Sequence, residues 1–410
     1  MQWSNNGVQS SNKSKRETIL LALGIVFVAA NMRAPITAVG PLLDQIRSSL
    51  QLNNTLAGML TTLPLLAFAI FSPLAPVLSR RYGMKAILLW AVVILTFGIL
   101  LRSWSGSISL FLGTALVGIA ISICNVLIPS LIKQDFPDRI GIMTGVFSVS
   151  MSSFGAVGSG LSFPIAAVLG WPEALRIWAA LSILASIVWL PQALREGRRK
   201  SIAGTVTDAG RNAAAAADTK INLWKSPLAW QVTFYTGLQS LIFYCLIAWL
   251  PDILLQKGVD PQQAGFMLSS MQITSIPVIF LGSLLAGQKA NHRTLVIVSI
   301  LCYVTGFFGM LISDGAITYV WAALFGIAGG LTFGLMMMYF TLRTRTAQEA
   351  AQLSGMAQSI GYLLAAVGPM LFGYLRDAVD NWRMPVYILI LVACLCLVFG
   401  VFAARDRYVS

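Results

Sequence analysis

Twelve apolar stretches, each about 20 residues long, follow one another along this chain with short polar breaks between them. The hydrocarbon core of a bilayer offers no water to the backbone, so a stretch of this length crosses it as a helix. Charged residues make up only 10% of the chain, against about 25% in a typical soluble domain. The sequence therefore predicts an all-α membrane protein with twelve transmembrane helices. The predicted helices cover residues 18–43, 54–79, 84–103, 107–132, 140–169, 174–193, 228–254, 262–287, 294–313, 316–341, 351–375 and 384–404.

The positive charge of the chain is unevenly distributed between the two sides of these helices. The net charge is +13, and the 28 Lys and Arg residues fall mostly in the terminal tails and in every second break. Such a bias marks the cytoplasmic side of a membrane protein. We therefore expect a multi-pass protein of the cytoplasmic (inner) cell membrane with both termini in the cytoplasm. The basic excess is then a topology signal, and no nucleic-acid partner is expected.

The chain divides into two halves that resemble each other. Thr144-Gly145 recurs as Ser354-Gly355, and Pro41 recurs as Pro251, each 210 residues further on. A shared offset in separate helices indicates two pseudo-symmetric six-helix bundles, the arrangement of secondary transporters that bind their substrate between the repeats. The predicted parts are a cytoplasmic tail (1–17), a first half (18–193), a cytoplasmic linker (194–226), a second half (227–404) and a second cytoplasmic tail (405–410).

The loop after the second predicted helix combines basic residues with a glycine. Its Arg81, Gly83 and Lys85 match the cytoplasmic signature of the major facilitator superfamily. The twelve helices, the linker and the repeat also resemble the organisation of that superfamily. Pro76 stands where that signature has its leading Gly, and Arg80 stands where it has an Asp that normally joins a charge network. The resemblance implies the major facilitator fold. It also implies a gating role for Arg80, Arg81, Gly83 and Lys85.

Further stretches resemble the cyanate/2-nitroimidazole permease family, and its 2-nitroimidazole branch more closely than its cyanate branch. They are Asn31–Arg33 followed by Gly40–Leu43, Leu60–Pro64, Ile132–Pro137, Ala248–Pro251 and Leu353–Tyr362. This resemblance covers nearly the whole chain. It implies a permease for a small solute, but family membership alone does not determine which one.

Arg33 lies in the middle of the first apolar stretch, where a permanent cation costs about 2.5–3.5 kcal/mol on insertion scales. No Asp or Glu lies deep in any other apolar stretch, so the sequence offers Arg33 no obvious counter-ion within the membrane. The functional interpretation is that Arg33 faces a central cavity and binds an anion or an electron-rich group through its planar guanidinium. The structural alternative is that Arg33 caps backbone carbonyls or bonds to a neighbouring helix.

The second half does not mirror this charge, because the position 210 residues after Arg33 is Phe243. We therefore predict an asymmetric cavity in which a cationic first half faces an aromatic, amide-bearing second half. The substrate-binding residues predicted beside Arg33 are Asn31, Thr37 and Asn125 from the first half, and Gln239, Tyr244, Gln272, Gln358 and Tyr362 from the second. The alternative for each is a role in holding helices together, which is common for polar side chains in membrane bundles.

Small residues recur on one side of the fifth predicted helix, among them Gly141, Gly145, Ser152 and Gly155. Such spacing lets helices approach closely, so we expect a packing and gating surface with no ligand role. Lys133, at the inner end of the fourth predicted helix, is expected to extend its side chain to the membrane interface.

The chain lacks the residue sets of other functional classes. Its single His, His292, falls in a predicted cytoplasmic loop without a metal-binding cluster, and no nucleotide-binding motif is present. Neither a cofactor nor an enzymatic activity is expected. The sequence instead predicts a monomeric, lipid-embedded transporter, secondary active or facilitative, that moves a small planar polar or anionic solute (cyanate- or nitroimidazole-like) by alternating access. The alternatives are drug efflux by the same superfamily and, from a different class, a non-transporting receptor or scaffold.

Overall fold

A computed structural model describes residues 15–52, 54–104, 106–204, 222–288, 292–313, 315–379 and 381–409. Within these ranges the regular structure is helical and contains no strand. Most of the predicted N-terminal tail, at 1–14, and the central part of the predicted linker, at 205–221, lie outside the described residues.

The first half begins at the first described residue and contains nine α-helices. They are α1 (Lys15–Thr37), α2 (Leu43–Leu50), α3 (Asn54–Phe71), α4 (Leu74–Tyr82), α5 (Met84–Arg102), α6 (Ser107–Asp135), α7 (Ile140–Leu169), α8 (Trp171–Arg176) and α9 (Trp178–Gly204). Short 3₁₀ turns at Gly40–Leu42 and Pro137–Arg139 join neighbouring helices. The last helix, α9, continues into the region predicted as linker, past the helix end predicted at 193.

The second half follows a 3₁₀ turn at Leu223–Lys225. Its helices are α11 (Pro227–Gln256), α12 (Pro261–Gly287), α13 (His292–Ile312), α14 (Thr318–Leu342), α15 (Ala347–Val379) and α16 (Arg383–Ala403), with a 3₁₀ turn at Gly315–Ile317 before α14. These six helices match the six predicted for this half to within a few residues at each end.

Eleven described helical stretches are long and apolar enough to cross a membrane, and α3 with α4 forms a twelfth span that bends by 57°. Pro73 lies at the bend and caps the start of α4. Because proline has no N–H, it cannot continue the hydrogen-bond ladder of α3. The predicted fold class is thus confirmed, and the span predicted at 54–79 consists of two segments.

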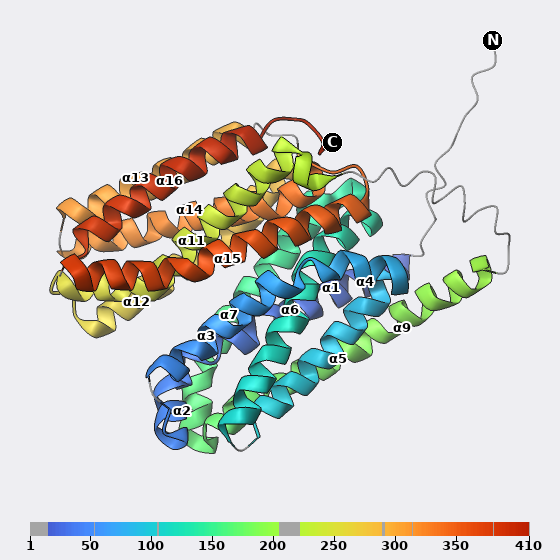
Figure 1. Ribbon diagram of the computed structural model, residues 1–410, viewed down its shortest axis with the longest axis horizontal. Coiled ribbons are helices and arrows are strands. Elements are labelled where there is room, and N and C mark those ends of the chain that lie inside the picture. The colour runs from blue at the N-terminus through green and yellow to red at the C-terminus, as the bar shows by residue number, and fades with distance from the viewer. Residues whose placement is uncertain are drawn as a thin grey trace, which may run out of the picture.

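The helices form two bundles, α1–α9 and α11–α16, that lie side by side (Figure 1). Across the seam between them, α7 packs against α12, and α15 packs against α3 and α6. Glycines allow these close approaches. A Cβ added to Gly145 of α7 would lie 2.8 Å from the Phe280 ring of α12, which agrees with the packing role predicted for this stretch.

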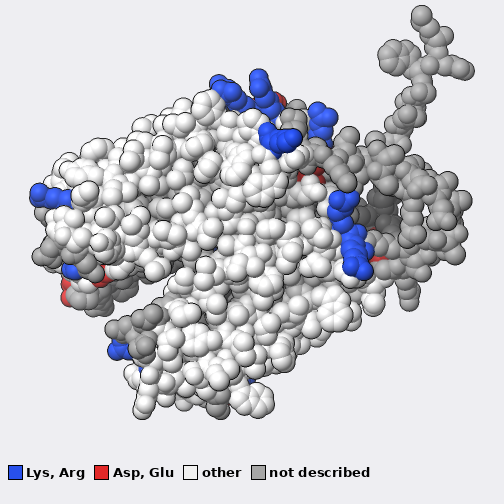
Figure 2. All heavy atoms as spheres, viewed as in Figure 1, with Lys and Arg blue, Asp and Glu red and all other residues white. Residues whose placement is uncertain are grey.

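The halves meet closely at one end of the molecule, where Lys and Arg side chains gather on the surface, and we call this end the basic face (Figure 2). Arg80 and Arg81 lie in the last turn of α4, and Arg343 follows the last residue of α14. Here α7 and α12 touch through glycine, since a Cβ added to Gly141 would lie 3.0 Å from the Cα of Gly287. At the opposite face the bundles diverge, and the surface is hollowed between them (Figures 1 and 2). The structure is therefore closed at the basic face and open toward the opposite face.

Candidate substrate site

Arg33 extends from α1 into the seam between the two halves. Its side chain passes over Gly155 of α7, where an added Cβ would lie 2.9 Å from Arg33 Cδ. Its Nη1 donates a hydrogen bond of 3.3 Å to Ser152 Oγ, one helical turn earlier on α7. On α7, Gly155 thus leaves room for the Arg33 side chain, and the Ser152 hydroxyl orients its guanidinium.

The guanidinium faces two aromatic rings of the second half. Arg33 Cζ lies 5.1 Å from the ring centre of Phe243 on α11 and 5.6 Å from that of Phe333 on α14. Both distances are within the range of cation–π attraction, which contributes about 0.5–2 kcal/mol per contact. Phe243 packs edge-on against Tyr244, with ring centres 5.4 Å apart. The structure therefore sets a cationic first half against an aromatic second half.

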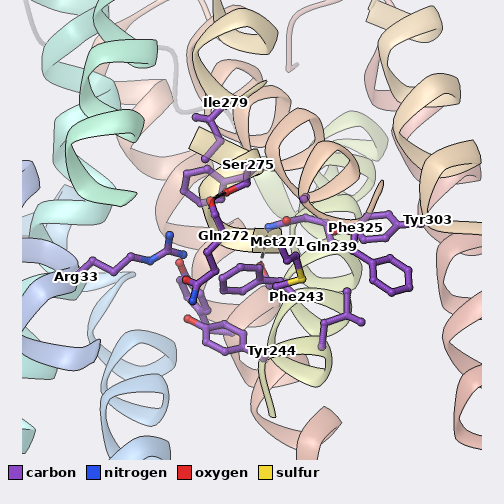
Figure 3. A pocket seen from close by; sticks show the side chains of 16 residues that line it. Arg33, Gln239, Phe243, Tyr244, Met271, Gln272, Ser275, Ile279, Tyr303 and Phe325 are labelled. Atoms are coloured by element: carbon purple, nitrogen blue, oxygen red, sulfur yellow. Dashed lines mark hydrogen bonds between the residues drawn. The ribbon is translucent and has the colours of Figure 1, made fainter. Parts of the chain in front are cut away.

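A cavity of about 40 Å³ lies beside the guanidinium (Figure 3). This space exceeds the roughly 10–15 Å³ that one water needs, so the cavity can hold water or a small solute. Most of the atoms exposed in its wall are apolar, and its neutral polar groups are amides and hydroxyls. Those groups belong to Gln239, Ser240, Tyr244, Gln272, Ser275, Tyr303 and Tyr362. One cation, a few neutral donors and aromatic faces suit a small planar anion or a flat polar ring.

The site carries positive charge that no described carboxylate balances. The ion pairs between described side chains lie elsewhere, at Lys85–Asp135, Glu173–Arg176, Glu17–Arg195 and Arg343–Asp406. In the described part of the chain, no three His, Cys, Asp or Glu side chains come together to hold a metal ion. The electrostatics of the cavity therefore favour an anion over a cation.

Five of the nine predicted site residues line this cavity: Arg33, Gln239, Tyr244, Gln272 and Tyr362. The Gln239 amide nitrogen donates to Ser240 Oγ at 2.8 Å and contacts Met336 Sδ at 3.0 Å. Gln272 is half-buried, lies on α12 and points toward the space in front of Arg33 (Figure 3).

Asn31 and Thr37 share α1 with Arg33 but do not line the cavity. The Asn31 amide donates to the Phe27 and Leu181 carbonyl oxygens at 2.8 and 3.1 Å, which ties α1 to α9. The Thr37 hydroxyl donates to the Gly155 carbonyl at 2.7 Å, which ties α1 to α7. The structure gives both side chains the alternative role, that of holding helices together.

Asn125 and Gln358 also lie outside the cavity lining, although they meet across the seam. The Gln358 amide donates to the Asn125 backbone carbonyl at 3.1 Å and to Ser354 Oγ at 2.7 Å. Gln358 is fully buried and Asn125 is 5% exposed. They join α6 to α15 on the closed side of the site.

Sequence reasoning missed three polar groups of the cavity wall, Ser240, Ser275 and Tyr303, and two direct partners of Arg33. Phe333 of α14 is one of many phenylalanines, and nothing in its sequence neighbourhood marks it as a partner of Arg33. Ser152 was interpreted as packing only, yet it accepts the Arg33 hydrogen bond. A signal was present, because a glycine and a serine three residues apart on α7 leave space for a long side chain from a neighbouring helix.

The predicted gating residues lie at the basic face. Gly83, with φ of 101°, adopts a conformation that favours glycine and separates α4 from α5. Lys85 forms an ion pair of 2.9 Å with Asp135 at the end of α6, and its backbone N–H donates to Glu196 of α9 at 2.8 Å. A charge network therefore exists here although Arg80 replaces the usual Asp. Arg80 and Arg81 border a separate cleft between α4 and α15.

The Lys133 side chain has protein partners at the basic face, which the prediction of a side chain at the membrane interface did not include. Its Nζ donates to the backbone carbonyls of Thr341 and Thr344 at the end of α14. The snorkelling rule assumes that water is the best partner for a lysine. Here the last carbonyls of a helix from the other half offer a closer one.

The contact between Gly155 and Arg33 leads to a first prediction. Gly155→Ala places a methyl group against Arg33 Cδ and Cγ, at 2.9 and 3.1 Å, so the guanidinium must shift. We expect transport to fall about tenfold, because small displacements of a binding group are costly. The measurement is solute counterflow in proteoliposomes. Gly160→Ala is the matched control, since an added Cβ there meets nothing within 4 Å, and it should transport normally.

Two halves of six membrane spans each, with a cation-lined cavity in the seam between them, have the architecture of secondary transporters. The chain matches the Major Facilitator Superfamily over residues 20–369, and it belongs to that superfamily. It is similar over 97% of its length to an uncharacterized transporter of Bacillus subtilis, YycB (41% identity, 96% of that protein), and to the 2-nitroimidazole transporter of Escherichia coli (39% identity, 98% of that protein). The cyanate transport protein CynX of Escherichia coli is 26% identical over 89% of this chain and 92% of its own.

The fold itself resembles that of the proton:xylose symporter XylE. The two structures superpose with a TM-score of 0.78 over 97% of this chain and 98% of that one, at 11% sequence identity. These comparisons confirm the predicted superfamily and its nitroimidazole and cyanate branch. They also confirm the predictions that the protein crosses the membrane several times and belongs to a class of permeases that are not enzymes.

Proposed function

We propose that this protein is a secondary active or facilitative transporter of a small planar polar or anionic solute, cyanate- or nitroimidazole-like. The observation that carries the proposal is Arg33, whose guanidinium lies in the seam between the halves, opposite aromatic rings and beside amides. A guanidinium presents its donors as a rigid fork that suits cyanate, nitro and carboxylate groups. Two of the relatives that match most of this chain are named for the transport of 2-nitroimidazole and of cyanate.

Transport would proceed by alternating access. The seam is closed at the basic face and hollowed toward the opposite face, so a solute would reach Arg33 from the opposite face in this state. Rocking of the halves around the site would then open the basic face. The distribution of Lys and Arg supports a cytoplasmic basic face, with the protein in the cytoplasmic membrane. A self-contained bundle supports a monomer.

The size of the cavity bears on the substrate. A cavity of about 40 Å³ favours a small anion such as cyanate over the larger ring of a nitroimidazole.

The test is counterflow of labelled cyanate and of a labelled 2-nitroimidazole into proteoliposomes that contain the native protein. Transient accumulation of either solute above equilibrium supports the proposal. A receptor or scaffold would show no counterflow with any solute. If neither solute moves but an aromatic cation does, the protein is a drug-efflux transporter and the substrate class proposed here is wrong.

A further inference from the structure

Lys133 makes a charged contact across the seam at the basic face. It lies near the end of α6 in the first half and is half-buried. Its ammonium donates to the carbonyl oxygens of Thr341, in the last turn of α14 in the second half, and of Thr344, just after that helix. One side chain of the first half therefore caps a helix of the second half.

The end of a helix is a suitable partner for a lysine ammonium. The last carbonyls of a helix have no partner within it and carry the negative end of its dipole. A lysine ammonium complements both features, and hydrogen bonds from a charged donor are stronger than neutral ones. When the seam opens at this face, the ammonium must exchange these carbonyls for water or for another partner.

The equivalent residue of the second half makes no such contact between the halves. The residue 210 positions after Lys133 is Arg343, at the corresponding end of α14. Arg343 donates to Ala403 and Ala404 at the end of α16, so it caps a helix of its own half. The two equivalent cations thus cap different helices, and only the Lys133 contact joins the two bundles.

Three neighbouring contacts across the basic face are neutral, and the Glu349 carboxylate at the start of α15 adds an attraction to the Lys133 ammonium. Gly141 lies against Gly287, Gly355 lies against Pro76, and the Gln348 amide donates to the Pro76 carbonyl at 3.2 Å. Such surfaces separate at a smaller electrostatic cost than a helix end and its ammonium cap.

We propose that Lys133 is the latch of the basic face: its ammonium holds α6 to α14 in the state open to the opposite face and releases α14 before the basic face opens. This inference rests on the alternating-access transport proposed above. Lys133 touches no substrate in this role and acts by setting the balance between two conformations.

The experiment measures hydrogen–deuterium exchange of the full-length protein in lipid nanodiscs, without solute, for the native protein and for Lys133→Met. Loss of a charge-assisted cap shifts a two-state equilibrium by about tenfold or more. Deuterium uptake should rise in the basic-face ends of α7 and α15 (residues 140–150 and 347–357). It should fall in the opposite ends of the same helices (residues 159–169 and 369–379). A loss of stability alone would raise uptake at both ends.

Two further variants isolate the role of Lys133. Lys257 is another half-buried lysine, and it donates to the Ser313 carbonyl at 2.9 Å, next to a helix end of the same half. Lys257→Met should therefore not produce the rise in uptake at one end of α7 and α15 with a fall at the other. Lys133→Arg keeps a cation of similar reach and should restore the native profile. An unchanged profile in Lys133→Met, or a rise at both ends of α7, would overturn the latch. Because no solute is present, an incorrect substrate class would leave this outcome unaffected.

Discussion

Arg33→Gln is expected to reduce transport at low solute concentration by about 100-fold while the protein still folds. A desolvated charge contact of this kind is worth about 3 kcal/mol, which corresponds to this factor. The described partners of Arg33 are one hydroxyl and two ring faces, so little of the packing depends on its charge. The measurement is the initial counterflow rate in proteoliposomes that contain equal amounts of reconstituted protein.

Arg33→Lys separates the charge from the shape of the guanidinium. Lysine keeps a cation but loses the planar fork, so a planar anion should bind more weakly than in the native protein and more tightly than in Arg33→Gln. Equal rates for Arg33→Gln and the native protein would show that Arg33 is structural. The cavity would then no longer be the candidate substrate site.

Most of the fold could be predicted from hydropathy, because a bilayer leaves the backbone few alternatives to a helix. What hydropathy missed were features that depend on local backbone chemistry. The 54–79 span bends because Pro73 interrupts its hydrogen bonds. The sixth span runs on to Gly204 because Arg and Lys side chains after 193 are compatible with helix once the chain leaves the membrane.

The site was predictable where the repeat breaks its own symmetry. Arg33 and its aromatic counterpart Phe243 occupy equivalent positions in the two halves, and the structure brings them to 5.1 Å. Polarity alone was a weaker guide, because a buried amide serves a cavity or a neighbouring helix equally well. Asn31 and Gln358 found backbone carbonyls on adjacent helices, which a sequence without helix orientations cannot reveal.

Cations near helix ends were the hardest to place. The distribution of charge predicts on which side of the membrane a lysine or arginine lies. It does not predict whether the partner is water, a lipid or a helix end. Lys133 and Arg343 are equivalent in the repeat, yet one crosses the seam and the other caps the end of α16 in its own half. Their partners depend on which helix ends come within reach after packing.

Arg343 carries the largest expected effect on stability. Its side chain is 1% exposed, and its guanidinium donates to the carbonyls of Ala403 and Ala404 at 2.9 and 3.0 Å and to His292 Nδ1 at 2.8 Å. The His292 Nε2–H donates to the Ala286 carbonyl at 2.9 Å, which leaves Nδ1 free to accept. Burial lowers the pKa of Arg343, while Tyr339 and Asp406 raise it. The guanidinium thus joins α13, α14 and α16 at the basic face.

Arg343→Met should lower the free energy of unfolding by about 3–5 kcal/mol, because it leaves the last carbonyls of α16 buried without donors. The measurement is unfolding of the purified protein in detergent, by heating or by SDS titration. Asp406→Asn is the control. That carboxylate is fully exposed although it accepts from Arg343 at 3.2 Å, so its variant should unfold at the native midpoint. If both variants lose stability equally, the surface ion pair and not the buried cap holds the helix ends together. If neither does, the packing of α13, α14 and α16 suffices without the cation.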